Sequence, residues 1–308
     1  MIVNRFFYND FLNLSNTIYK PINGGMKLTR KIKGINLPFL ILCVIHSCLL
    51  GITFYKNKNR KNIFILLMSN IGFAYLFEYF VFNLFKAYKY KPNIIRNNFF
   101  DSVFGAVLSQ AIFVPFTSVF LSVSNSGWFK KSLAGMYFAI IELIFLRLGV
   151  YKHKGWKTIY TLILIPLYFK WSDVWYYLLD KKNETIRFIS FFLMIMVTET
   201  NLFLLLALFR KLRFGMGRYH SWKEHFIISP LYSISMSLFT AFSLKKQNTF
   251  VAKLRVVLFT LVLKHFFVKI GILKNNLRFW VFLLKRIIMV SIYGQYRNWV
   301  YEDLEEET

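Results

Sequence analysis

Long runs of apolar residues, each about as long as a membrane is thick, recur along almost the whole chain. A helix rises about 1.5 Å per residue, so about 20 residues cross a hydrocarbon core of about 30 Å. A closed barrel would instead show short strands of alternating polarity. The pattern predicts an all-α fold, a polytopic transmembrane helical bundle of about nine spans. The predicted spans cover residues 36–55, 63–86, 101–122, 133–150, 158–179, 187–209, 226–244, 251–273 and 279–297.

Two parts of the chain, about 122 residues apart, resemble one another. The sequence at 147–152, RLGVYK, recurs at 269–274 as KIGILK, and Lys131 then falls on Lys253. An offset of four spans keeps the same orientation, so the pattern predicts a parallel internal duplication. The narrower form of this prediction matches spans three to five with spans seven to nine. The wider form divides the chain into an interfacial N-terminal segment (1–34), two four-span repeats (35–156 and 157–278), and a last span with an acidic tail (279–308).

The composition is that of a membrane protein with a large positive charge. Hydrophobic residues make up 56% of the chain and aromatic residues 20%, which is far from the usage of soluble domains. Lys and Arg outnumber Asp and Glu by 40 to 14. The charges lie in short clusters between apolar runs, so anionic lipids are expected as partners and nucleic acid is not.

The distribution of Lys and Arg predicts which side of the membrane each connection faces. More of them lie in the connections on the side of the N-terminus, which places the N-terminus in the cytoplasm of a multi-pass protein of a bacterial cell membrane. The cluster at 56–61 in the first outer connection goes against this trend. No cleavable signal is expected, because the first 34 residues lack a short apolar region followed by small residues.

Metal and cofactor motifs are not expected from this sequence. The two cysteines, Cys43 and Cys48, lie in one apolar run with His46 between them. Their spacing does not bring all three side chains to one helix face, so a metal site is not predicted. Glycine-rich phosphate loops and nucleophile elbows are lacking, which predicts no cofactor and disfavours an enzyme.

The stretch from Asn98 to Trp171 resembles an uncharacterised family of roughly five-span membrane proteins of endospore-forming Gram-positive bacteria. The residues that carry the resemblance are Asp101, Pro115-Phe116-Thr117, Glu142 and the run 149–157, GVYKHKGWK. The second copy matches weakly, because Lys264 replaces Glu142 and Asn275 replaces His153. The resemblance implies a multi-pass bacterial membrane protein of sporulating cells and carries no activity.

Charged residues within spans are the candidate functional residues, since each costs about 2.5–3.5 kcal/mol at the centre of a bilayer. Glu142 and Lys264 occupy equivalent positions of the two copies with opposite charge. They are predicted to pair across the interface between the copies. Such a pair would either fix the packing of the two halves or line a route for protons or ions.

A second candidate is a polar patch that suits a cation or a proton. Glu199 lies within Thr198-Glu199-Thr200-Asn201, and Glu78 with Asn83 offers a poorer version in the first copy. Oxygen ligands of this kind can replace the water around a cation, although hydrogen bonding between helices explains them equally well.

A third cluster, formed by Trp171, Asp173 and Trp175, is expected to lie in an aromatic belt at the membrane surface. A cation held between Asp173 and the aromatic faces is the alternative.

Two functions follow from these patterns. The first is movement of a small ion or polar solute across the cytoplasmic membrane, with Glu142, Lys264, Glu78 and Glu199 at the interface between the copies. The second is a scaffold, or a subunit of a larger complex, that binds other membrane proteins and transports nothing. The scaffold is favoured by the scarcity of proline, with only six in the chain, because transporters often interrupt helices at their sites.

Overall fold

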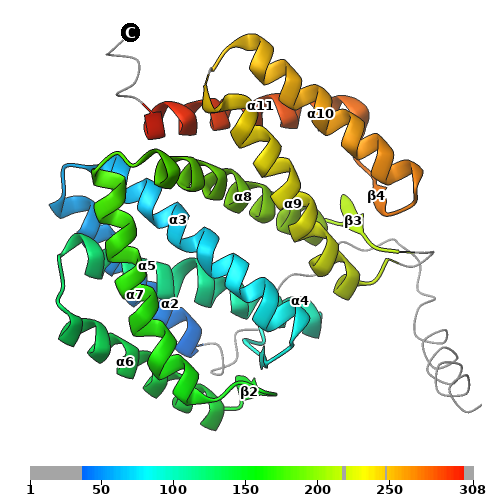
Figure 1. The fold of residues 1–308 in the computed structure, drawn as a ribbon. Helices are drawn as coiled ribbons and strands as arrows, with labels where there is room; N and C mark the ends of the chain where they lie inside the picture. The colour runs from blue at the N-terminus through cyan, green and yellow to red at the C-terminus, as the bar shows by residue number, and fades with distance from the viewer. Residues whose placement is uncertain (1–36, 217–219, 247, 302–308) are drawn as a thin grey trace, which may run out of the picture.

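A computed structural model describes residues 37–216, 220–246 and 248–301 of the chain, mostly as helices (Figure 1). The predicted interfacial segment at 1–34 and the acidic tail at 302–308 lie outside the described residues.

Nine long helical units follow one another in the described ranges, and each coincides with one predicted span. They are α2 (Leu37–Lys56), α3 (Arg60–Glu78) continued by the π-helical turn η2 (Tyr79–Leu84), α4 (Asn98–Val107) continued by the π-helical turn η3 (Leu108–Phe113) and α5 (Val114–Val123), α6 (Trp128–Arg147), α7 (Thr158–Asp180), α8 (Glu184–Leu208), α9 (Trp222–Lys245), α10 (Phe250–Lys269) and α11 (Phe279–Tyr301). The helical fold class is therefore confirmed.

Five of these units are long and apolar enough to cross a membrane. They are Leu37–Lys56, Arg60–Leu84, Asn98–Val123, Glu184–Leu208 and Trp222–Lys245. The other four, α6, α7, α10 and α11, are not among the helices that combine sufficient length and apolar composition, and their crossing stays a prediction.

The helix ends follow from local sequence. Asn59, Asn97, Asn183 and Thr249 precede helices, and their side chains accept hydrogen bonds from the first backbone N–H groups. Ser221 forms a full capping box with Glu224 at the start of α9.

Each half of the described chain contains one antiparallel pair of short strands, and we call these the first and the second strand pair. β1 (Tyr88–Tyr90) pairs with β2 (Tyr151–His153), and β3 (Leu212–Phe214) pairs with β4 (Leu273–Asn275). In both cases the second strand follows a helix that ends at a glycine with positive φ, Gly149 at 69° and Gly271 at 74°. Glycine adopts this conformation without the strain that a Cβ brings, so the chain reverses there.

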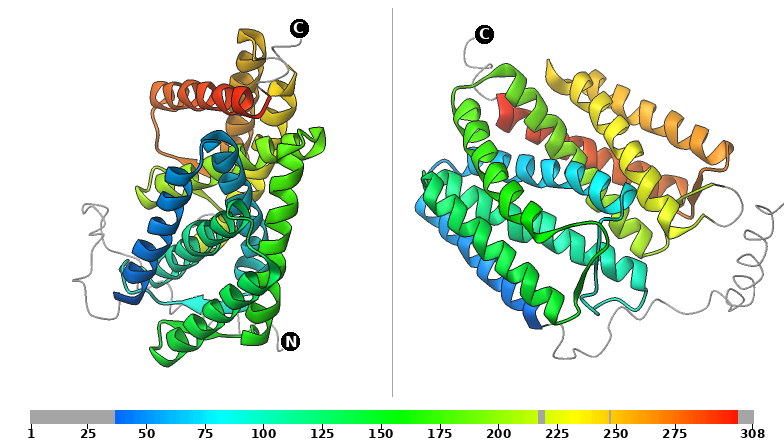
Figure 2. Two further views of the ribbon diagram at one scale, coloured as in Figure 1. Left: turned by 90° about the vertical axis from the view of Figure 1, so that its left-hand side faces the viewer. Right: turned by 60° about the horizontal axis from the view of Figure 1, so that its bottom comes forward.

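The two halves meet at the centre of the molecule, where α3 packs against α8 (Figure 1). α3 also contacts α5 and α7, and α8 contacts α9 and α11. The backbones approach closely at Gly72, where an added Cβ would lie 2.9 Å from Leu193. α6 and α10 lie on opposite edges of the structure, as the two further views also show (Figure 2).

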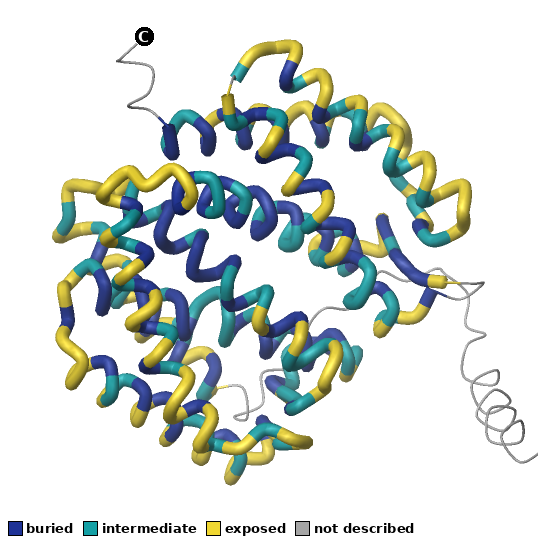
Figure 3. The backbone as a smooth tube through the Cα atoms, viewed as in Figure 1, coloured by how far each residue is buried: buried dark blue, intermediate teal, exposed yellow. Residues whose placement is uncertain are grey.

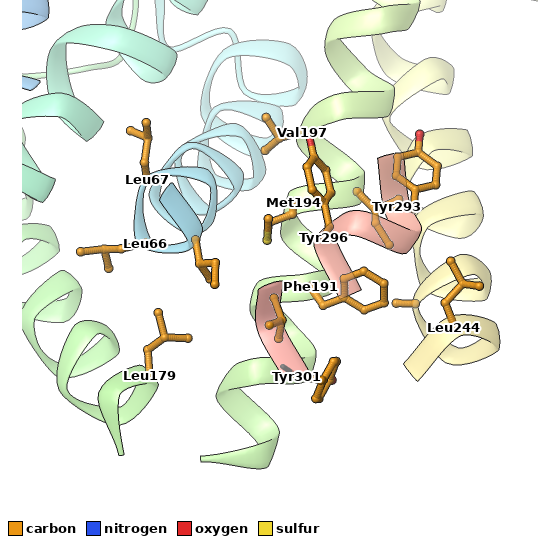
Figure 4. Packing of buried hydrophobic residues seen from close by; sticks show 14 of the residues in the cluster. Leu66, Leu67, Leu179, Phe191, Met194, Val197, Leu244, Tyr293, Tyr296 and Tyr301 are labelled. Atoms are coloured by element: carbon orange, nitrogen blue, oxygen red, sulfur yellow. The ribbon is translucent and has the colours of Figure 1, made fainter. Parts of the chain in front are cut away.

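The largest core cluster joins both halves. Leu66 and Leu67 of α3, Met194 of α8, and Tyr293 and Tyr296 of α11 belong to it (Figure 4). Many residues of the outer helices are exposed (Figure 3), and large apolar residues such as Ile140 of α6 and Val262 of α10 are among them. In a bilayer the outer face contacts lipid tails, so close packing and hydrogen bonds, rather than apolar burial alone, hold the helices together.

Buried polar side chains link α3, α5 and α7. Asn70 donates to Ser172 at 3.0 Å and accepts from Ser118 at 3.0 Å. Ser122 lies 2.9 Å from Asp173, which also binds Lys131 at 2.8 Å. These bonds, together with the ion pair to Lys131 of α6, orient the helices relative to one another.

Candidate functional site

A cavity of about 460 Å³ lies in the first half of the molecule. It is lined by α2, α3, α6, α7, the η3–α5 segment and both strands of the first strand pair. We call it the aromatic cavity. Its aromatic lining consists of Phe73, Phe77, Tyr88, Tyr90, Phe113, Phe138, Phe145, Tyr151, Trp156, Tyr168 and Trp171. Its polar lining outside the tyrosines is small: Ser109, Gln110, Glu142 and Thr161. A mostly apolar space with a few convergent polar groups is typical of a small-molecule site.

Glu142 is held in the wall of the aromatic cavity by three donors. Its side chain is 10% exposed, and Oε1 lies 2.8 Å from His153 Nε2 and accepts from Thr158 at 2.8 Å. Oε2 accepts a hydrogen bond from Thr161, whose hydroxyl in turn accepts from Trp156 Nε1 at 2.8 Å. These bonds fix the carboxylate between α6, α7 and the end of β2.

The first strand pair brings three tyrosines to the cavity, Tyr88, Tyr90 and Tyr151. Tyr90 lies directly over Gly105, where an added Cβ would meet the Tyr90 Cβ at 2.5 Å, so only glycine allows this approach. Tyr90 and Tyr151 are paired across the two strands, with ring centroids 4.9 Å apart. Burial raises the pKa of Tyr88 and Tyr90 well above the usual value, so their hydroxyls stay protonated and act as donors.

Two π-helical turns lie near these spaces: η3 lines the aromatic cavity, and η2 lines a second pocket described below. A π-helical turn inserts a residue into a helix and changes the direction of the side chains around it, and such turns occur frequently at functional sites. Here η3 places Gln110 in the wall of the aromatic cavity and also in the wall of a second pocket.

The second pocket, about 90 Å³, lies between α3 and α4 of the first half and α8 and α9 of the second. We call it the interface pocket. Glu78, Asn83, Thr200 and Asn201, which were predicted to form an ion or proton site, all line it. Glu78 is buried and accepts a hydrogen bond from Tyr88, a residue of the aromatic cavity. The tertiary structure therefore gathers most of the predicted polar patch at the contact between the halves.

Glu199 and Thr198 point elsewhere. Glu199 is buried against Arg286 of α11, and it accepts a further hydrogen bond from Tyr293 at 2.7 Å. Thr198 donates to Met194 O at 2.8 Å in its own helix. The α8 helix turns about 100° per residue, so neighbours in the sequence face different helices, and Glu199 takes part in an ion pair rather than in the interface pocket.

The predicted pair between Glu142 and Lys264 does not form among the described residues. Glu142 binds His153, Thr158 and Thr161 as described, whereas Lys264 lies over the ring of Phe282 at 3.9 Å. Both side chains face the interior of their own half, one towards α7 and the other towards α11. The prediction failed because α6 and α10 lie on opposite edges of the molecule, so these helices do not meet (Figure 2).

The predicted aromatic cluster is divided by the fold. Trp171 is half exposed, at 49%, and Trp175 is buried, with its Nε1 donating to Ser190 at 3.0 Å. Asp173 pairs with Lys131, which itself is only 1% exposed. Trp175 is thus a core residue of the contact between α7 and α8, and Asp173 closes an ion pair.

Among the described residues, no group of three or more His, Cys, Asp or Glu side chains is placed to hold a metal ion. The described cysteines, Cys43 and Cys48, are both free thiols.

The sequence does not predict a role for the tyrosines of the first strand pair or for Gln110. Tyr88 and Tyr90 lie in a connection whose sequence is typical of a basic loop. That loop becomes a cavity wall only because it pairs with residues about 60 positions later. The Gly149-Val150-Tyr151 motif, present in both halves in related form, was the available signal.

Comparison with known proteins gives no match: no protein-family model, no curated protein and no solved structure is similar to this chain.

Proposed function

We propose that this protein moves a small ion or polar solute across a membrane through the aromatic cavity and the interface pocket. The observation that carries the proposal is that the two spaces adjoin at one wall, formed by Gln110 and the hydrogen bond between Tyr88 and Glu78. Each space contains one carboxylate, Glu142 in the first and Glu78 in the second. Ionisable groups kept within apolar helices are costly, and they commonly mark substrate or proton pathways.

The wall between the two spaces suggests how passage is controlled. A solute that leaves the aromatic cavity for the interface pocket must displace the Tyr88 hydroxyl from Glu78 or move the amide of Gln110. The Glu78 carboxyl accepts from the Tyr88 hydroxyl and also interacts with the side-chain amide of Gln110, so both residues of this wall hold the buried group that a proton or a cation would reach. In this mechanism Glu78 is the group whose occupancy changes during passage, and Glu142 holds the solute in the cavity.

The proposal includes an internal duplication, which is supported by backbone hydrogen bonds that recur in the two halves. Val150 N donates to Phe145 O as Ile272 N donates to Phe267 O, at 3.1 and 3.0 Å. Next to each strand pair, Lys91 N donates to Val150 O as Gly215 N donates to Ile272 O, at 2.7 and 2.9 Å. The two sets match α3–α7 with α8–α11 and leave α2 outside the repeat. This alignment differs from the predicted boundaries at 35–156 and 157–278, which left the last span outside.

The nine-span arrangement and its orientation are also part of the proposal. Both strand pairs lie among the Lys and Arg clusters of the connections. This favours the same side of the membrane for both of them and a cytoplasmic N-terminus in a bacterial cell membrane. Anionic lipid headgroups are the expected partners of these clusters.

The test is flux through liposomes that contain the purified protein, under an imposed membrane potential, for protons, monovalent cations and small organic cations. Glu78→Gln keeps the shape and a hydrogen bond to Tyr88 but removes the charge, so we expect flux to fall about tenfold or more. Glu184→Gln, at an exposed position in the first turn of α8, is the matched control and should transport normally. Equal flux in both variants would remove Glu78 from the pathway.

A scaffold function is the second candidate, and the exposed apolar face of α10 and α11 supports it. Val262 is 68% exposed and Trp280 is 74% exposed at this edge of the molecule. A defined complex in mild detergent, together with no flux above that of empty liposomes, would favour the scaffold over transport.

A further inference from the structure

We propose that the aromatic cavity binds a small organic cation of the quaternary ammonium class. This inference rests on the proposed transport function, because it names the solute that enters the first of the two spaces. It is carried by the charge of the lining, the arrangement of the rings and the lack of free hydrogen-bond acceptors.

The charge of the lining is opposite to that of the chain. Lys and Arg outnumber Asp and Glu by 40 to 14, yet Glu142 is the single charged side chain among the described residues that line the cavity. An anionic ligand would find no cationic partner there. A monovalent cation would find one carboxylate, that of Glu142, in the wall and no positive side chain in the lining.

The rings around Glu142 are arranged to enclose a cation. Tyr88 and Trp156 are almost perpendicular, at 87° with centroids 5.6 Å apart, and Tyr88 and Tyr90 meet at 76°. Phe77 meets Trp156 at 81°, with centroids 6.1 Å apart. Rings at right angles turn their negative faces in different directions, so they form walls of a box, and each face within about 6 Å of a cation contributes about 0.5–2 kcal/mol.

The polar groups of the cavity favour a cation that needs no hydrogen bonds. Glu142 already accepts from His153, Thr158 and Thr161, so few of its lone pairs remain for a ligand. A primary ammonium or a metal ion would lose its water without enough acceptors to replace it. A quaternary ammonium carries no N–H and is weakly hydrated, so it loses less. The volume of about 460 Å³ is within the range of small-molecule sites.

The second half explains why one site of this kind is expected rather than two. The matched hydrogen bonds of the two halves give an offset of 122, which places Arg286 where Leu164 lines the cavity. Arg286 is fully buried there and pairs with Glu199. A guanidinium paired with a carboxylate thus stands in the second half at a position where the first half has an apolar cavity wall.

The test compares choline with its neutral carbon isostere, 3,3-dimethylbutan-1-ol, by calorimetry and tryptophan fluorescence on the full chain in mild detergent. We expect choline to bind about tenfold tighter or more, since one to two favourable ring faces and a carboxylate act on the charge alone. Glu142→Gln should reduce this difference, because only the ring faces then act on the charge, while binding of the neutral isostere is retained, which also shows that the variant is folded. Trp156→Leu should weaken choline about tenfold, and Trp280→Leu, at an exposed position of α11, should not.

The outcomes separate this inference from the proposed function. Equal affinity for the two isosteres, or a preference for the neutral one, overturns the inference. Flux of protons or inorganic cations in liposomes, with no binding of choline, also overturns it and leaves the transport function standing. Choline binding that depends on Glu142, without flux of labelled choline, supports the inference and refutes transport.

Discussion

The ion pair between Glu199 and Arg286 is the most deeply buried charged contact among the described residues, and it allows a quantitative prediction. The two side chains are 1% and 0% exposed, and they join α8 to α11. Tyr293 adds a third group through its hydrogen bond to Glu199. Removing one partner of such a pair leaves an uncompensated buried charge, which costs about 3–5 kcal/mol.

The two single variants should differ from one another. In Glu199→Leu, Arg286 stays charged because a guanidinium does not lose its proton in proteins, so the full cost of about 5 kcal/mol is expected. In Arg286→Met, the remaining carboxylate can take up a proton and keeps its bond to Tyr293, so the cost should be about 3 kcal/mol. The double variant removes both charges and should lose only about 1–2 kcal/mol, since replacing a buried pair by apolar residues is often close to neutral.

The measurement is a double-mutant cycle on the free energy of unfolding, obtained by SDS titration in mild detergent and followed by circular dichroism. The predicted coupling between the two sites is about 6 kcal/mol in favour of the pair, from 5 and 3 for the single variants against 2 for the double variant. Costs that add within about 0.5 kcal/mol would refute the reasoning, because they would mean that neither charge depends on the other.

Three further predictions concern the two strand pairs and their surroundings. Gly105→Ala should cost about 1–3 kcal/mol of unfolding free energy and displace Tyr90, and tyrosine fluorescence or crosslinking to β2 would report the shift; unchanged stability would contradict the close approach. Asp101 accepts hydrogen bonds from three consecutive backbone N–H groups, those of residues 93–95, each at 2.8 Å, so Asp101→Asn should cost about 1.5–3 kcal/mol in the same SDS titration. Gly149→Ala and Gly271→Ala should each cost about 1–2 kcal/mol, because both residues have positive φ, and a loss at one position alone would count against equivalent turns in the two halves.

The helices of this protein were predictable because the signals for them are local. Apolar runs of about 20 residues marked all nine helical units, and the capping residues before them lie within a few positions of the ends that they stabilise. The recurrence of a glycine turn after α6 and after α10 was also predictable, because residues 147–152 and 269–274 have similar sequences.

The candidate site was predictable only in part. Glu78, Glu142 and Glu199 could be recognised because a carboxylate within an apolar run is conspicuous. Their partners could not be recognised, because Tyr88 contacts Glu78 and His153 contacts Glu142 from the strand pair that joins residues 88–90 to 151–153. That pairing depends on contacts between distant segments, which no local pattern encodes.

The sequence by itself thus determined that this is a helical chain, where its helices lie, and that a few charged groups are kept among apolar residues, because each of these follows from the composition of one segment. Only the tertiary structure decided that Glu142 faces α7 rather than Lys264, that Glu199 pairs with Arg286, and that Glu78 shares a pocket with Asn201. The physical reason is that a partner is chosen by the direction in which a side chain leaves its helix and by which helices pack together, and both are properties of the assembled fold.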